Sequence, residues 1–347
     1  MKTYLCILSF FLSIVVANAQ SDKAIFLHHS TGGAVFEGGN VTQWITDYNT
    51  QQSTNYSATE LAYPNDPWGW ENYPYDFWKL WVGGSCDNNS SNIQCFDKLC
   101  QDYELIIFKH CFPGAGIGED SGNGDVASAE KTLANYQLQY RALLALFDQY
   151  PNNKIMVWTL APLHRNATDA GQAARAVQFT NWVKNTWLTE DWKSHPNVFI
   201  FDFFGLAAEQ SATPANGMQY CLKYDYEGDH NGNDSHPNNA ANQLIGPLFA
   251  EQVVTILKSA TLATENISSL VSLELRGEAS SKTISYKITG RAAKTPFQLE
   301  VFSVLGQPIK TMVTSNNSGL ITLNHNNGIY IVRVTINGRY ISQKVIL

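Results

Sequence analysis

The sequence predicts an α/β domain with a five-stranded parallel sheet, followed by a small all-β, immunoglobulin-like sandwich. Two observations predict this fold class. Up to about residue 260, apolar runs typical of buried strands alternate with stretches whose apolar residues recur at helical spacing, the pattern of a parallel sheet with helices on both faces. From residue 268 onward, short runs of alternating polar and apolar residues are separated by turn residues, which is typical of a β-sandwich.

Five apolar runs are expected to form the parallel sheet. They are residues 24–27, 60–63, 104–109, 154–160 and 197–202, of which the second is the weakest. The third run is apolar without alternation, as a strand buried on both faces should be. Apolar residues at helical spacing predict helices over residues 126–150, 173–188 and 239–259, with one or two helical turns over 75–82.

The chain is expected to divide into three parts. Residues 1–19 have the features of a secretory signal, with Lys2, an apolar stretch and a small-residue cleavage site before Gln20. Residues 20–260 form the α/β domain, and residues 261–347 contain a linker and the β-sandwich. No later stretch is long and apolar enough to span a membrane, and no cysteine follows the cleavage site. We therefore expect an exported protein without an integral membrane segment or a lipid anchor.

The net charge and the cysteine content argue against two classes of function, nucleic-acid binding and structural zinc binding. The formal net charge of -7 argues against a nucleic-acid partner. Of the six cysteines, Cys6 lies in the signal, and the odd number that remains leaves at least one free thiol. The spacing allows Cys86 to pair with Cys95 but does not fix the pairing. The absence of a CxxC pair from the sequence argues against a structural zinc site, and neither a metal nor a cofactor is expected.

Ser30 and His236 are the candidate catalytic pair. Ser30 follows the first predicted strand, at the end where open α/β sheets bind ligands. A serine hydroxyl needs a base within hydrogen-bond reach, and the base needs an acceptor that orients it. His236 precedes the last predicted helix, and Asp234 lies two residues before it, with Asp202 and Asp229 as other acidic candidates. The alternative is that these polar residues only form turns and cap the helix.

These motifs resemble those of the SGNH (GDSL-type) hydrolases over roughly residues 24–258. Residues 234–238, Asp-Ser-His-Pro-Asn, resemble the last motif block of that family, and residues 27–32, Leu-His-His-Ser-Thr-Gly, stand where its Gly-Asp-Ser-Leu block would be. The resemblance implies a flavodoxin-like three-layer sandwich and serine esterase chemistry. Ser30 would attack an acyl carbon, His236 would take and return the proton, and backbone N–H groups would hold the oxyanion.

The chain departs from the family pattern around both catalytic candidates. His28 and His29 replace the Gly-Asp pair before the serine, and the usual acid position, three residues before the histidine, holds Asn233. Asp234 at two residues before the histidine is therefore the expected acid.

The third family block, Gly-x-Asn-Asp, is also altered. The chain has Lys-His-Cys-Phe-Pro at residues 109–113, so a donor from Lys109, His110 or the backbone would have to replace the asparagine. Gly69 is the best candidate for the glycine of the oxyanion hole.

An aromatic cluster between residues 64 and 81 suggests the substrate class. Trp68 and Trp70, with Trp78 and Trp81, could stack on a sugar ring, although a packed loop is an equal alternative, and His29 could line the site. The favoured prediction is a carbohydrate O-acetyl esterase. The alternatives are a lipid or aryl esterase of the same fold and a non-catalytic glycan-binding protein on a degenerate hydrolase scaffold.

The end of the chain carries a second set of motifs. They are Val-Phe-Ser-Val-Leu-Gly-Gln-Pro-Ile at residues 301–309, Asn-Gly-Ile-Tyr-Ile-Val-Arg-Val at 327–334 and Lys-Val-Ile at 344–346. Over about residues 266–347 they resemble the type A sorting domain of the type IX secretion system. The resemblance implies a Bacteroidetes-type bacterium, export through the periplasm and outer membrane by the type IX machinery, and removal of the domain. The alternative is an ordinary immunoglobulin-like adhesion or sugar-binding module.

Overall fold

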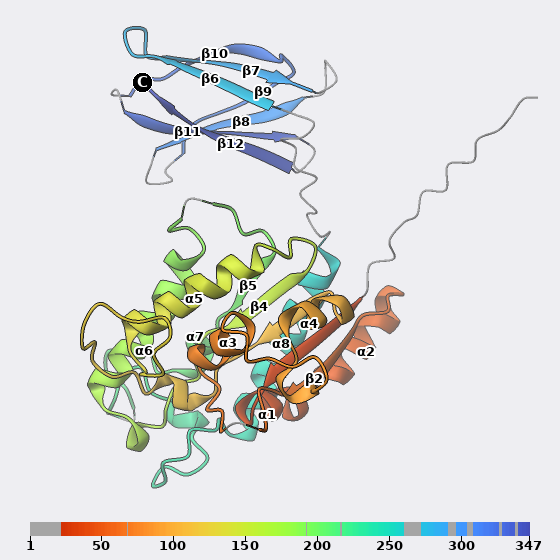
Figure 1. Cartoon of the computed structure of the whole chain (residues 1–347), viewed down its shortest axis with the longest axis vertical. Coiled ribbons are helices and arrows are strands. Elements are labelled where there is room, and N and C mark those ends of the chain that lie inside the picture. The colour runs from red at the N-terminus through yellow and green to blue at the C-terminus, as the bar shows by residue number, and fades with distance from the viewer. Residues whose placement is uncertain are drawn as a thin grey trace, which may run out of the picture. The chain divides into compact units, whose positions relative to one another are not determined.

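The computed structural model describes residues 22–67, 69–191, 193–215, 217–259, 272–290, 296–303, 308–325, 328–336 and 339–347. These residues form two compact units, an N-terminal one that extends to residue 259 and a C-terminal one that begins at residue 272 (Figure 1). The predicted signal segment at residues 1–19 and the candidate substrate residue Trp68 lie outside the described residues.

The N-terminal unit contains a five-stranded, all-parallel sheet. Its strands are β1 (Lys23–His28), β2 (Ser57–Ala62), β3 (Leu105–Phe108), β4 (Lys154–Trp158) and β5 (Val198–Phe201). They lie in the order β2-β1-β3-β4-β5, so the predicted parallel sheet is confirmed. The strand order reverses between β1 and β3, and open α/β sheets bind ligands outside the carboxyl ends of the strands at such a point.

Helices cover both faces of this sheet (Figure 1). One face packs against α1 (Thr31–Gly38), α2 (Val41–Gln52) and α8 (Asn239–Lys258). The other packs against α3 (Pro74–Trp81), α4 (Phe96–Asp102), α5 (Leu133–Phe147) and α6 (Ala170–Trp182). A π-helix (Val183–Trp187) continues α6, and α7 (Phe203–Ala207) follows β5. Short 3₁₀ helices occupy Ser91–Ile93, Phe112–Ala115, Arg165–Ala167 and Tyr224–Tyr226.

The central strands send apolar side chains into the helix layers on both faces of the sheet. Phe26 of β1 stacks on Trp158 of β4 in the layer of α1 and α8, with ring centroids 4.9 Å apart. Phe108 of β3 packs on Phe77 of α3 in the other layer, with centroids 4.8 Å apart. Because both faces are covered by apolar side chains, these strands show no polar alternation in the sequence. Burial of such large side chains supplies the main driving force for folding.

The helix predicted over residues 126–150 begins only at Leu133. Thr132 caps it, since its hydroxyl accepts a hydrogen bond from the backbone N–H of Asn135 at 3.4 Å. The preceding residues form turns whose carbonyls accept hydrogen bonds from the side-chain amide of Gln139. Their apolar residues continue the helical spacing, but side chains of α5 hold them in a non-helical path.

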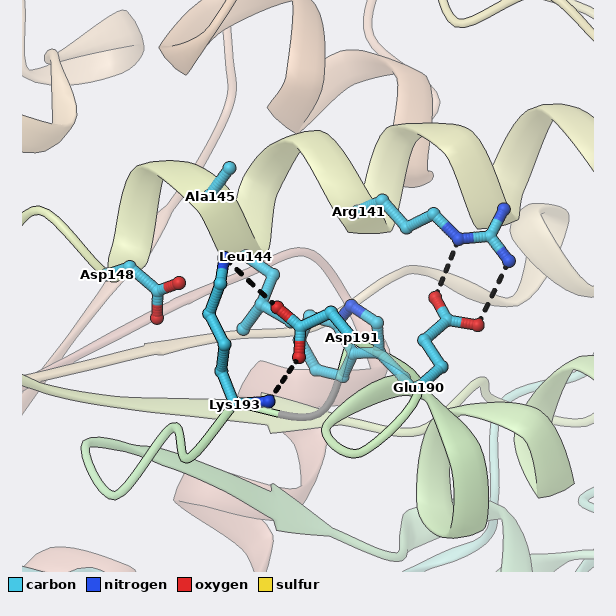
Figure 2. Close-up of a pocket in the computed structure, with 8 residues that line it drawn as sticks. Arg141, Leu144, Ala145, Asp148, Glu190, Asp191 and Lys193 are labelled. Atoms are coloured by element: carbon cyan, nitrogen blue, oxygen red, sulfur yellow. Dashed lines mark hydrogen bonds and ion pairs between the residues drawn. The ribbon is translucent and has the colours of Figure 1, made fainter. Parts of the chain in front are cut away.

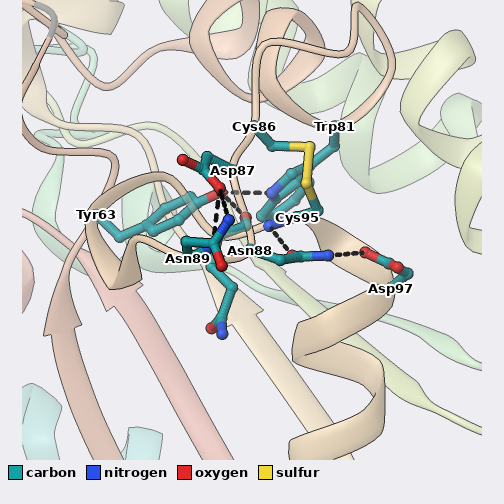
Figure 3. Close-up of a disulfide and its surroundings, with 9 residues drawn as sticks. Tyr63, Trp81, Cys86, Asp87, Asn88, Asn89, Cys95 and Asp97 are labelled. Carbon is teal, nitrogen blue, oxygen red and sulfur yellow. Dashed lines mark hydrogen bonds between the residues drawn. A yellow bond between two sulfur atoms is a disulfide. The ribbon is translucent and has the colours of Figure 1, made fainter.

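Cys86 and Cys95 form a disulfide that closes the loop between α3 and α4 (Figure 3). This is the pairing that the cysteine spacing allowed, and an exported protein can keep it. Inside the loop, Asn88 accepts a hydrogen bond from the backbone N–H of Cys95 at 3.0 Å. Beside it, the indole N–H of Trp81 donates to the hydroxyl of Tyr63 at 2.5 Å. Among the described residues, Cys100, Cys111 and Cys221 form no disulfide.

The C-terminal unit is a sandwich of two antiparallel sheets. One sheet has the order β10-β7-β6 and contains β6 (Ser272–Glu278), β7 (Thr283–Thr289) and β10 (Ser318–Thr322). The other has the order β12-β11-β8-β9, with β8 (Phe297–Ser303), β9 (Pro308–Thr314), β11 (Ile329–Ile336) and β12 (Arg339–Ile346). The predicted all-β sandwich is confirmed. In the described ranges, no helix of the protein has the length and apolar character needed to cross a membrane.

Replacing Cys86 and Cys95 by serine should lower the free energy of unfolding by about 2–3 kcal/mol, because the crosslink restricts the unfolded chain over a short loop. Urea unfolding followed by tryptophan fluorescence would measure this loss. The reduced parent protein should unfold at the same midpoint as the variant. An unchanged midpoint for both would contradict a stabilising role of the disulfide.

Candidate active site

Ser30 lies in the turn between β1 and α1. The residue is exposed, and its Oγ atom is 3.3 Å from the Sγ atom of Cys111, which follows β3. Since β1 and β3 are the strands between which the strand order reverses, the hydroxyl lies at the edge of the sheet where this fold positions a ligand.

His236 lies just before α8 and is paired with Asp234. The Nδ1–H of its ring donates to Oδ1 of Asp234 at 2.5 Å, and the same oxygen accepts from the backbone N–H of His236 at 3.1 Å. Partial burial raises the pKa of Asp234, but the hydrogen bonds and charge of His236 outweigh it and leave the pKa lowered. Asp234 therefore stays ionised and can hold the ring in the tautomer that leaves Nε2 free to accept a proton.

Ser30 and His236 contact consecutive residues of one segment. Ser30 touches Cys111, and the ring of His236 packs edge-on against the ring of Phe112, with centroids 5.0 Å apart. In the part of the chain that is described, no hydrogen bond joins Ser30 to His236, and such catalytic bonds are often long in free enzymes and tighten when substrate binds. The fold thus brings the candidate nucleophile, base and acid together around the end of β3.

A backbone contact between α1 and α8 sets the positions of the two candidate residues. A Cβ atom on Gly39 would lie 2.5 Å from the Cα atom of Gly246, and one on Gly246 would lie 2.4 Å from the Cα atom of Gly39. Ser30 precedes α1 and His236 precedes α8. The close approach of the helices therefore brings both residues to the same edge of the sheet.

The loop that carries His236 is anchored to the loop after β4. The carboxylate of Glu227 is fully buried and accepts hydrogen bonds from Arg165 and, at 2.8 Å, from His230. The backbone N–H of His164 donates to the hydroxyl of Ser235 at 2.8 Å. These bonds fix the residue that directly precedes the candidate base.

The candidate oxyanion donors differ in their placement. The backbone N–H of Ser30 stands at the start of α1 and donates to no acceptor among the described residues, so it is available to a negatively charged oxygen. Gly69 is exposed, and nothing lies within 4 Å of a Cβ atom added there. Its loop meets the site through the carbonyl of Asn72, which accepts from the N–H of Cys111 at 2.7 Å.

The side chain of His110 does not reach the site. It is fully buried beside Phe77 and shares a 2.7 Å hydrogen bond with the hydroxyl of Tyr140 on α5. Burial, together with the charge of Lys109, lowers its pKa to about 3, so the ring is neutral. The ring of His110 therefore does not serve as the expected oxyanion donor, because the end of β3 turns it into the layer of α3 and α5.

The two histidines before the serine have protein partners. His29 stays partly exposed, and its Nε2–H donates to the carbonyl of Pro64 at 2.5 Å, which ties the serine turn to the loop after β2. His28 is buried and donates from Nε2 to Glu60 at 2.8 Å. Burial and the charge of Lys109 lower the pKa of His28 to about 4, so this contact is a hydrogen bond from a neutral ring.

The aromatic cluster divides into a surface part and a core part. Trp70, Tyr75 and Trp78 are partly exposed, and the ammonium group of Lys79 lies 5.7 Å from the ring centre of Trp70. Trp81 is buried, because α3 turns its ring into the core. The expectation that Trp81 stacks on a sugar ring is therefore wrong.

A hollow of about 370 Å³ opens beside the last turns of α5 (Figure 2). Helix α5 leads from the carboxyl ends of the strands to their amino ends, so the hollow lies at the edge opposite Ser30. Its charged side chains pair with one another or with a neighbour, as in Arg141 with Glu190 and Asp148 with His195. The hollow therefore does not include the candidate site, which lies around Ser30 and His236.

Glu60 should make the stability of the N-terminal unit depend on pH. Burial, then the charge of Glu37 and a hydrogen bond with it, raise the pKa of Glu60 from 4.5 to about 7. Between these values the folded protein keeps a proton that the unfolded chain has lost, so this carboxyl lowers stability as the pH rises. Across this window Glu60→Gln should gain stability relative to the parent by about 1–2 kcal/mol, since the carboxyl is partly solvated.

Urea unfolding of parent and variant at several pH values would measure this gain. The difference between the two proteins removes the contribution of the buried His110, whose lowered pKa makes stability rise with pH. A difference that does not change with pH would contradict the raised pKa of Glu60.

Among curated proteins, none matches the sequence significantly. Solved structures show weak likeness. A gut microbial diltiazem-metabolizing enzyme is 12% identical over 87% of this chain and 72% of its own, with a TM-score of 0.38. The BSP domain of a biofilm-associated protein is 13% identical over 23% and 15%, and Bacteroides uniformis beta-glucuronidase 3 is 19% identical over 21% and 11%, with TM-scores of 0.21 and 0.15. The match to the BSP domain spans only about 15% of the length of that protein chain. None of these likenesses assigns an activity.

The C-terminal unit has a clear family match. Residues 279–347 match the secretion system C-terminal sorting domain. The matched residues include strands β7 to β12 of the sandwich. The resemblance to a type IX sorting domain is therefore confirmed, and the protein is exported by the type IX machinery to the cell surface or beyond.

Proposed function

We propose that the N-terminal unit is a serine hydrolase of the SGNH type that cleaves ester bonds outside the cell. The observation that carries the proposal is the convergence of Ser30 and the Asp234–His236 pair on Cys111 and Phe112. These groups are the residue types that nucleophilic acyl transfer needs, and they lie around one segment at the end of β3.

In the proposed reaction, Ser30 Oγ attacks the acyl carbon while Nε2 of His236 takes the hydroxyl proton. The carbonyl oxygen becomes an oxyanion, which the backbone N–H of Ser30 stabilises. The oxyanion then re-forms the carbonyl, the ester bond breaks, and His236 returns the proton to the leaving alcohol. A water molecule hydrolyses the acyl-enzyme by the same steps and releases the carboxylic acid.

We propose an acetylated carbohydrate as substrate. The partly exposed rings of Trp70, Tyr75 and Trp78 lie on the segment that joins the site through Asn72 and Cys111. Aromatic faces of this kind bind the apolar faces of flat ligands such as sugar rings. A sorting domain that delivers the enzyme outside the cell fits a polymeric substrate found there.

A fluorophosphonate probe should label Ser30 in the mature protein, because it reacts with serines activated by a base and an oxyanion hole. Labelling should vanish in Ser30→Ala and fall by at least about 100-fold in His236→Ala. Mass mapping of the labelled peptide identifies the residue. As a matched control, Ser121→Ala removes another exposed serine and should label like the parent. Folded parent protein that takes no label would contradict the proposal.

Acetate release from acetylated oligosaccharides should distinguish the substrate classes. Trp70→Ala should raise KM for such a substrate about 3- to 10-fold, with little effect on p-nitrophenyl acetate, because only the larger substrate reaches the aromatic surface. Trp44→Ala, at a partly exposed tryptophan on α2, is the matched control. Faster hydrolysis of long-chain esters would instead favour a lipid esterase. Glycan binding without turnover, kept in Ser30→Ala, would favour a binding protein.

A further inference from the structure

Two fully buried lysines stand at opposite edges of the parallel sheet, and their surroundings differ. Lys154 begins β4 at the amino edge, where its ammonium group donates to the carboxylate of Glu104 at 2.6 Å and to the carbonyls of Leu257 and Ser259. Lys109 follows β3 at the carboxyl edge, beside the candidate site. In the ranges described, its ammonium group has no carboxylate partner and donates to a single carbonyl, that of His29, at 3.3 Å.

A buried cation without a carboxylate is costly, because little compensates for its lost hydration. Burial lowers the pKa of Lys109 to about 8, so it is still charged at neutral pH. The neighbouring His28 and His110 are neutral there and supply no negative charge. Among the described residues, no carboxylate pairs with Lys109, whereas Glu104 pairs with Lys154.

The packing around Gly32 shows that the turn after Ser30 leaves room for the side chain of Lys109. A Cβ atom on Gly32, in the first turn of α1, would lie 2.8 Å from Cδ of Lys109 and 2.4 Å from Cβ of His28. Glycine at this position lets the lysine side chain pass beneath the turn. The aliphatic part of Lys109 thus supports α1 at the residues next to Ser30.

The carbonyl that Lys109 contacts belongs to the same peptide group as the backbone N–H of Ser30. We propose that Lys109 is a positioning residue that fixes and polarises the His29–Ser30 peptide, so that the N–H of Ser30 binds the oxyanion of the reaction. An ammonium group on the carbonyl oxygen draws electrons through the amide and strengthens the N–H as a donor. This inference rests on the proposed esterase function and assigns the role of the missing asparagine to a residue that acts through the backbone.

The positive charge of Lys109 would stabilise the oxyanion, as would the hydrogen bond from the N–H of Ser30. The oxyanion forms in the transition state at the start of α1, near an uncompensated buried cation. Fixed charges and dipoles in such a site stabilise the transition state without reorganisation. The substrate carries no such charge before the attack, so Lys109 should affect kcat and leave KM nearly unchanged.

Lys109→Met, which keeps the length and apolar part of the side chain, should lower kcat for p-nitrophenyl acetate about 10- to 100-fold, with KM within about threefold of the parent. The rate of fluorophosphonate labelling at Ser30 should fall by a similar factor. Lys109→Gln keeps an N–H donor without the charge and tests the same loss where the methionine variant does not fold. Circular dichroism and thermal unfolding establish that each variant is folded at the assay temperature.

The matched control is the double variant Lys154→Met with Glu104→Gln, which removes the other buried lysine together with its partner. It should keep the kcat of the parent even where its melting temperature falls. Parent-like kcat and labelling in folded Lys109→Met would overturn the inference while leaving the esterase intact. An equal loss in the double variant, or failure of both Lys109 variants to fold, would assign Lys109 to the fold alone. A parent without turnover or labelling would overturn the proposed function and this inference with it.

Discussion

The close contact between α1 and α8 is the constraint on which the candidate site depends. Gly39 and Gly246 let the two backbones touch, and a side chain at either position would push the helices apart. Each helix follows directly on one of the candidate catalytic residues, Ser30 or His236. A change in the way these helices cross would therefore move Ser30 and His236 relative to each other. The geometry of the reactive edge is set by packing within one layer of the core.

The buried lysines at the two edges of the sheet have different partners. At the amino edge, Lys154 and Glu104 neutralise each other, as buried charges do when their role is structural. At the carboxyl edge, Lys109 lies beneath the serine turn, where its ammonium group donates to the carbonyl of His29 and pairs with no carboxylate of the described residues. The burial of this cation costs free energy, and the cation lies where negative charge would develop during the proposed reaction. Placed elsewhere in the core, the same arrangement would only destabilise the protein.

Much of the fold was predictable because the strands and α8 have strong apolar patterns. Ser30 stood out because it follows the first strand, and His236 because it precedes the last helix. Helix α1 was not predictable, since Gly32 and its neighbour suggest a turn, and the close packing of His28 and Lys109 that requires glycine at position 32 appears only in the structure. Nor could the sequence decide which of two adjacent residues faces the site. The end of β3 turns His110 into the core and leaves Lys109 beneath the turn, and this depends on tertiary packing.

The spacing of Asp234 and His236 shows how the local backbone joins the candidate acid to the candidate base. Asp234 is one residue closer to His236 than the usual acid, which could place its carboxylate out of reach. Instead, one oxygen accepts both the backbone N–H and the ring N–H of His236, so that the short turn itself presents the carboxylate to the ring. Ser235, between them, is buried and bonded to the loop after β4, which prevents the turn from opening. The buried hydroxyl of Ser235 therefore anchors the turn that presents Asp234 to the ring of His236.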